Sequence, residues 1–153
     1  MSGIQLPVVA VGVDGSAASR AAIEYAFAAA DARKAPLIAV HCWTDPSIDD
    51  PVPGYCEGQV GVAQIQDEER TLLAGELADW VERYPDVRVQ QAVIHDRPAV
   101  GLLEYAPFAQ LIVAGSRGHG GVAGMLLGST GQALIAHGTC PVVIVRPATS
   151  PQR

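Results

Sequence analysis

The chain has 153 residues, 49% of them hydrophobic and only 5% aromatic, which is typical of one compact domain and not of a disordered chain. The formal net charge is −6, and Lys34 is the only lysine among the 10 basic residues. Because no basic cluster could neutralise the phosphates of a polymer or a lipid surface, we expect neither nucleic acid nor a membrane as partner. No apolar run approaches the length of a membrane span or of a secretory signal, so we expect a cytoplasmic protein.

Five β-rich runs divide the chain. Four are continuously apolar and stop at turn signals, at residues 6–13, 36–43, 111–114 and 141–145. Continuous apolar runs predict strands buried on both faces. The remaining run, residues 87–94, alternates between apolar and polar positions and predicts an edge strand.

Helical patterns separate these runs, over residues 17–34, 62–84, 98–103 and 129–138. Ser16 is predicted to cap the first helix and Ser129 the last one, and Pro98 suits the first position of the short third helix. The alternation predicts a doubly wound α/β fold, in which a parallel sheet carries helices on both faces.

Two glycine-bearing turns fall at the carboxyl ends of predicted strands, where ligands bind in doubly wound sheets. The turns are Gly12-Val13-Asp14-Gly15-Ser16 after the first strand and Gly115-Ser116-Arg117-Gly118 after the fourth, and Gly128-Ser129-Thr130-Gly131 opens the last helix. If the winding reverses between strands one and four, both turns face one crevice.

The residue types in these segments suit a phosphate-bearing ligand. Glycines permit positive φ and a close approach of backbone N–H groups to phosphate oxygens. The segment from Gly128 to Thr130 adds a helix N-terminus and two hydroxyls, and Arg117 adds a charged fork. Asp14 is expected to accept hydrogen bonds from a ribose or a base.

The sequence resembles the universal stress protein family over nearly its whole length, from about Val8 to Arg146. The spacing Gly115-x2-Gly118-x9-Gly128-Ser129 resembles that family's ATP-binding signature. The opening Val9-Ala10-Val11-Gly12-Val13-Asp14-Gly15-Ser16 looks like its first strand and turn, and Cys140-Pro141-Val142-Val143-Ile144-Val145 looks like its last strand.

The resemblance implies one nucleotide-binding domain over residues 1–153, with a five-stranded parallel sheet in the order 3-2-1-4-5. It implies an adenine-nucleotide-binding stress-response module whose ligand is ATP or a related nucleotide, with Mg²⁺ as a companion ion. Asp14 and the backbone at Val40 would hold the nucleoside end. The expected binding residues are Gly12, Val13, Asp14, Val40, Gly115, Arg117, Gly118, Gly128, Ser129 and Thr130. The family also implies a homodimer paired through the last strand, Val142 to Val145.

Other functional classes fit less well. A dinucleotide-binding fingerprint would follow the first strand, a P-loop would need a lysine after its glycines, and no GxSxG nucleophile motif is present. Three cysteines without a CxxC and four scattered histidines predict neither a disulfide framework nor a metal site. Cys42 and Cys140 are interpreted as small core residues. We predict no catalytic residue, and the alternatives that stay open are a slow ATP hydrolase and a sensor of AMP or cyclic AMP.

Overall fold

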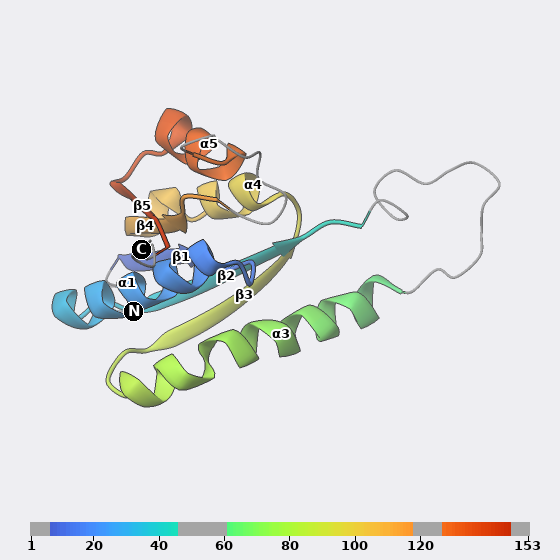
Figure 1. Cartoon of the computed structure of the whole chain (residues 1–153), viewed down its shortest axis with the longest axis horizontal. Coiled ribbons are helices and arrows are strands. Elements are labelled where there is room, and N and C mark those ends of the chain that lie inside the picture. Colours follow the sequence, from blue (N-terminus) through green and yellow to red (C-terminus); the bar gives the residue numbers. More distant parts are fainter. Residues whose placement is uncertain (1–6, 46–60, 118–126, 148–153) are drawn as a thin grey trace, which may run out of the picture.

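The computed structural model describes residues 7–45, 61–117 and 127–147 (Figure 1). Its strands are β1 (Val8–Gly12), β2 (Leu37–Trp43), β3 (Val89–His95), β4 (Ala109–Gly115) and β5 (Val142–Val145). All pair in parallel, in the order β3-β2-β1-β4-β5. The predicted doubly wound sheet is therefore confirmed, with its reversal of winding between β1 and β4.

The helices are α1 (Ala17–Arg33), α3 (Val62–Arg83), α4 (Pro98–Leu103) and α5 (Ser129–His137), with a short 3₁₀ turn, η1, at Ala106–Phe108. Helices α1 and α3 lie on one side of the sheet, and α4 and α5 lie on the other (Figure 1). The alternation of side chains along each strand explains the two layers. Val9 and Val11 face the α1 layer, while Ala10 between them faces the α4 layer.

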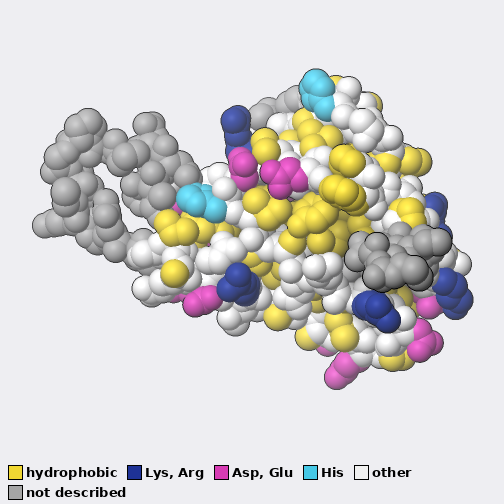
Figure 2. All heavy atoms as spheres, turned by 180° about the vertical axis from the view of Figure 1, so that it is seen from behind, with side chains coloured by type: hydrophobic (Ala, Val, Ile, Leu, Met, Phe, Trp, Pro, Cys, Tyr) yellow, Lys and Arg dark blue, Asp and Glu magenta, His cyan; other side chains and the backbone are white. Residues whose placement is uncertain are grey.

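The two layers differ in the size of their buried clusters. The α1 layer is centred on Phe27, which is fully buried and lies with its ring 6.2 Å from that of Trp80. The α4 layer rests on two short helices, and Val100, Phe108 and Ile135 are exposed there. Hydrophobic side chains gather across the middle of the molecule when it is seen from behind (Figure 2). The α1 layer encloses the larger cluster of buried side chains, and both layers leave large hydrophobic side chains exposed, among them Leu72 of α3.

Two details of the predicted elements are wrong. The N-cap of α5 is Gly128, with Ser129 as the first helical residue, and no side chain caps this helix. The apolar run of β5 is not buried on both faces, because β5 forms an edge of the sheet and its four residues are only partly buried. The prediction for Ser16 is confirmed, since its hydroxyl accepts the Ser19 N–H at 3.1 Å as the cap of α1.

Candidate functional site

The turn after β1 is held by a closed set of short-range hydrogen bonds. One carboxylate oxygen of Asp14 accepts the Ser16 N–H at 2.9 Å, and the Asp14 N–H donates to the Ser19 hydroxyl at 3.0 Å. Gly15 has a φ of 81°, which suits a residue without a Cβ. Val13 is tied to the neighbouring strand, because its N–H donates to the Val40 carbonyl at 2.9 Å. The Asp14 side chain is thereby fixed at the carboxyl edge of the sheet.

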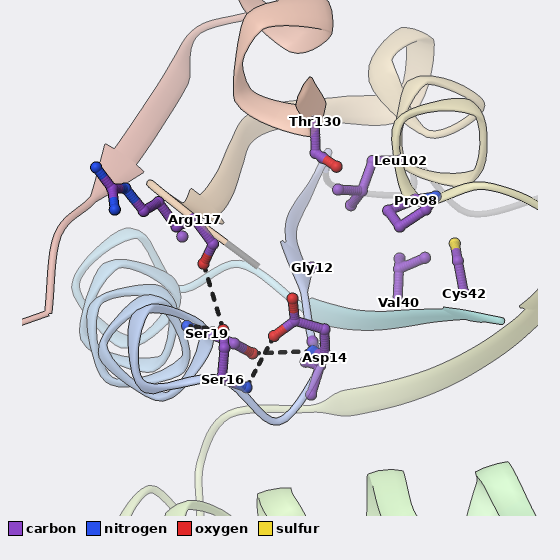
Figure 3. A pocket seen from close by; sticks show the side chains of 12 residues that line it. Gly12, Asp14, Ser16, Ser19, Val40, Cys42, Pro98, Leu102, Arg117 and Thr130 are labelled. Atoms are coloured by element: carbon purple, nitrogen blue, oxygen red, sulfur yellow. Dashed lines mark hydrogen bonds between the residues drawn. The ribbon is translucent and has the colours of Figure 1, made fainter. Parts of the chain in front are cut away.

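The turn after β4 brings the start of α5 to the same edge. The Ser116 N–H donates to the Val145 carbonyl at 2.8 Å, and the Ser116 carbonyl accepts the Gly128 N–H at 2.7 Å. The Ser16 hydroxyl donates to the Arg117 carbonyl at 3.4 Å, which joins the two turns (Figure 3). The two segments that the sequence singled out therefore meet at the reversal of winding.

A pocket opens between these turns. Figure 3 shows Asp14, Ser16 and Ser19 on one side of it and Leu102, Pro98 and Thr130 on the other. Its lining consists of Gly12, Val13, Asp14, Ser16, Ser19, Val40, Cys42, Pro98, Leu102, Gly115, Arg117 and Thr130. One end is apolar and the other carries hydroxyl and carboxylate groups, which suits a ligand with a flat apolar part and a polar tail. The Arg117 side chain points away from the pocket, so the charged group expected there does not line it (Figure 3).

Seven of the ten predicted binding residues line this pocket: Gly12, Val13, Asp14, Val40, Gly115, Arg117 and Thr130. Gly128 and Ser129 adjoin it at the start of α5 without lining it. Gly118 lies outside the described residues. The structure thus places the two glycine-bearing turns around one cavity.

Five lining residues were missed by the sequence analysis as ligand-binding candidates. Ser16 is the N-cap of α1 and Ser19 lies in its first turn, and Cys42 lies two residues beyond Val40, on the same side of β2. Those three positions could have been found from the periodicities of the helix and the strand. Pro98 and Leu102 come from α4, and no motif connects that helix with the reversal of winding.

Two expectations about the glycines are corrected. Gly115 and Gly128 do not have positive φ, which among the described glycines occurs at Gly15 alone. A Cβ on Gly115 would lie 2.8 Å from both the carbonyl carbon and the Cβ of Ala18. Gly115 is thus required for the close packing of α1 on β4, whatever the pocket binds. Nor is the Gly128 N–H free for a ligand, since it donates to Ser116.

Cys42 is partly buried against the core of the α4 layer, in line with its interpretation as a core residue, and it also lies on the pocket wall. Burial raises the pKa of the Cys42 thiol to about 12, and the negative charges of Asp96 and Glu104 act in the same direction. The Gly101 N–H opposes this shift through a hydrogen bond. At neutral pH the side chain is therefore a neutral thiol that adds to the apolar end of the pocket.

A sequence model described as the Universal stress protein family matches residues 7–146. The chain therefore belongs to the universal stress protein family. A universal stress protein of Mycobacterium tuberculosis is 43% identical over 145 residues, which are 95% of this chain and 45% of that relative. The chain thus spans about half the length of the curated relatives it matches.

Solved structures share the fold. A universal stress protein in complex with cAMP has a TM-score of 0.67 at 24% identity, over 94% of this chain and 99% of the other. The universal stress protein from Archaeoglobus fulgidus in complex with dAMP has a TM-score of 0.62 at 19% identity, with the same coverage of 94% and 99%. None of the helices in the described ranges combines the length and apolar character that a membrane crossing requires.

Proposed function

We propose that the pocket binds an adenine nucleotide and that the chain works as a nucleotide-dependent regulatory module of the stress response. The observation that carries the proposal is the position of the pocket, between the turns after β1 and β4 at the carboxyl edge of a doubly wound sheet. Two structures with this fold are described as complexes with cAMP and dAMP. Among the adenine nucleotides we propose ATP as the ligand, with Mg²⁺ as its counter-ion.

The pocket divides into two ends that match the two ends of a nucleotide. The base would lie against Val40, Cys42 and Leu102, and the ribose hydroxyls would donate to the Asp14 carboxylate. The phosphates would extend toward Thr130 and the first turn of α5, whose N–H groups lack a side-chain cap. The proposed binding set remains Gly12, Val13, Asp14, Val40, Gly115, Arg117, Gly118, Gly128, Ser129 and Thr130.

The nucleotide is tested directly by mass spectrometry of whatever co-purifies with the chain and by calorimetry with ATP, ADP, AMP and cyclic AMP. Thr130→Val, which replaces the hydroxyl by a methyl group of similar size, should weaken ATP binding by roughly fivefold to tenfold, because one hydrogen bond to a charged phosphate is lost. Thr139→Val is the matched control on an exposed position outside the pocket and should leave affinity unchanged. Absence of binding by all four nucleotides would refute the proposal.

We also propose that the chain forms a homodimer through β5. This strand is apolar throughout and leaves one side of its backbone at the edge of the sheet, an arrangement that favours pairing with another strand. The Pro141 carbonyl accepts the Ile112 N–H of β4 at 3.0 Å, and the Val145 carbonyl accepts the N–H of Ser116, the residue after β4, at 2.8 Å. Since backbone groups alternate along a strand, Val143 also faces β4, whereas Val142 and Ile144 direct their N–H and C=O groups to the open edge.

This alternation makes the dimer testable with proline. Ile144→Pro removes an N–H that points to the open edge and should give folded monomers in sedimentation equilibrium at micromolar concentration. Val143→Pro is the matched control, because it removes an N–H that faces β4 and should destabilise the fold itself. A parent chain that sediments as a monomer, or an Ile144→Pro variant that remains a dimer, would contradict the proposal.

A further inference from the structure

A sheltered polar contact joins the first pocket turn to helix α3. His41 on β2 lies between two oxygens: its Nδ1 is 2.7 Å from the Val13 carbonyl oxygen, and its Nε2 contacts the Glu69 carboxylate. The side chains of His41 and Glu69 are only 15% and 23% exposed. Val13 and Asp14 both line the pocket, so the contact reaches the pocket through a single peptide unit.

Helix α3 presents Glu69 from a fixed position. One turn earlier, Gln66 accepts a hydrogen bond from the Trp43 indole N–H at 2.7 Å and donates to the Val93 carbonyl at 2.6 Å. These contacts tie the first half of α3 to the carboxyl ends of β2 and β3. The backbone of α3 at Glu69 is therefore held beside β2, within reach of His41.

The ring of His41 faces two acceptors, and this limits where its hydrogens can be. A carbonyl oxygen and an ionised carboxylate can only accept, whereas a neutral imidazole has one N–H. Both contacts are hydrogen bonds only if the pair holds one extra proton, which makes the ring an imidazolium or Glu69 a carboxylic acid. When that proton leaves, the ring must give its remaining N–H to one of the two oxygens.

We propose that His41 is a positioning residue for the nucleotide pocket, holding the Val13 carbonyl and hence Asp14 in place, and that Glu69 decides which ring nitrogen keeps its hydrogen. This inference rests on the proposed function. With the extra proton present, both oxygens are satisfied. Without it, the charged carboxylate takes the N–H, because hydrogen bonds to ionised groups are the stronger ones. Nδ1 then turns a lone pair toward the Val13 carbonyl, which loses its hydrogen bond to the ring, and the turn keeps only its contacts with Ser16, Ser19 and Val40.

Three carboxylates belong to the elements next to the ring. Glu69 of α3 contacts it, Asp14 follows Val13 in the β1 turn, and Asp45 follows β2. His95 of β3 stacks on Trp43, with ring centroids 4.0 Å apart. The Glu69 carboxylate that contacts Nε2 favours a hydrogen on that nitrogen. A rise in pH should therefore loosen the nucleoside end of the pocket while the rest of the fold stays intact.

The protonation of the His41 ring can be measured by NMR in the nucleotide-free protein. Nitrogen chemical shifts of His41, followed from acid to alkaline pH, should show a change from two protonated ring nitrogens to Nε2 alone. In Glu69→Gln, the amide can donate to Nε2, so Nδ1 should keep its hydrogen at about pH 9. Exchange of the Asp14 and Gly15 amides should be slower in this variant than in the parent chain at about pH 9. A parent ring that keeps its hydrogen on Nδ1 throughout this pH range would overturn the inference.

Measuring the affinity for AMP tests whether the contact between His41 and the Val13 carbonyl affects nucleotide binding. Because the phosphate of AMP itself titrates at about pH 6, each variant is compared with the parent at the same pH. Relative to the parent, Glu69→Gln should gain affinity for AMP at least about fivefold between pH 6 and pH 9. His41→Asn, whose amide can donate where Nδ1 does, should gain affinity in the same way. Identical pH profiles for the parent chain and Glu69→Gln would overturn the inference. If no chain binds AMP, the proposed function fails, and the ring shifts and amide exchange still decide the role of His41.

Discussion

Replacing Gly115 by alanine should destabilise the protein by about 1–3 kcal/mol, the usual cost of overpacking a close contact. The added Cβ would lie 2.8 Å from the carbonyl carbon of Ala18 and 3.0 Å from its oxygen. Backbone atoms cannot turn aside as a flexible side chain can, so helix α1 would have to move away from β4. Urea unfolding, followed by circular dichroism, measures the loss as a lower transition midpoint with an unchanged slope.

The same chemical change elsewhere in the chain gives a control of opposite sign. Gly75 lies within α3, and a Cβ built there meets nothing within 4 Å. Gly75→Ala should therefore stabilise the protein by about 0.5–1 kcal/mol, the difference in helix propensity. Adding Ala18→Gly to Gly115→Ala removes the side-chain part of the clash and should recover part of the loss. A neutral effect of Gly115→Ala would show that the contact between α1 and β4 adjusts without cost.

The layered fold was predictable because its signals are local. Each continuous apolar run ends at a turn residue, and the helical patterns between the runs leave room for parallel crossovers. The strand order came from the resemblance to the family. Asp14 was predictable as a site residue for the same reason, since it directly follows β1 and the carboxyl end of a central strand meets the reversal of winding.

The site residues that were missed or misinterpreted from the sequence owe their roles to contacts between segments that are far apart in the chain. Leu102 reaches the pocket because Gly12 leaves space for it: a Cβ on Gly12 would lie 2.9 Å from Leu102 Cδ1. No feature of the sequence near Gly12 indicates that it packs against Leu102, which lies 90 residues later in the chain. Gly115 was interpreted as a phosphate-loop glycine, but its environment shows a packing requirement at Ala18. A glycine in a motif can thus be required for packing, and the sequence alone does not distinguish such a glycine from one that is required for ligand binding.

Replacing Asp14 by asparagine should weaken adenosine-containing ligands by roughly 10-fold to 100-fold, which corresponds to one hydrogen bond to a charged acceptor. One carboxylate oxygen of Asp14 is occupied by the Ser16 N–H, and the other points toward the side of the pocket on which Leu102 and Thr130 lie (Figure 3). Asparagine can retain the first contact through its amide oxygen. At the second position it presents an N–H₂ group, which cannot accept a hydrogen bond from a ribose hydroxyl.

Two comparisons make the Asp14 result specific. Asp14→Ala removes both contacts, so it should weaken ligand binding at least as much as Asp14→Asn and should also destabilise the turn after β1. Tripolyphosphate has no nucleoside, and Asp14→Asn should bind it at least as well as the parent chain, since a negative charge has been removed. Calorimetry with AMP, ATP and tripolyphosphate separates these effects. Equal weakening of ATP and tripolyphosphate by Asp14→Asn would mean that Asp14 supports the pocket as a whole and does not recognise the nucleoside.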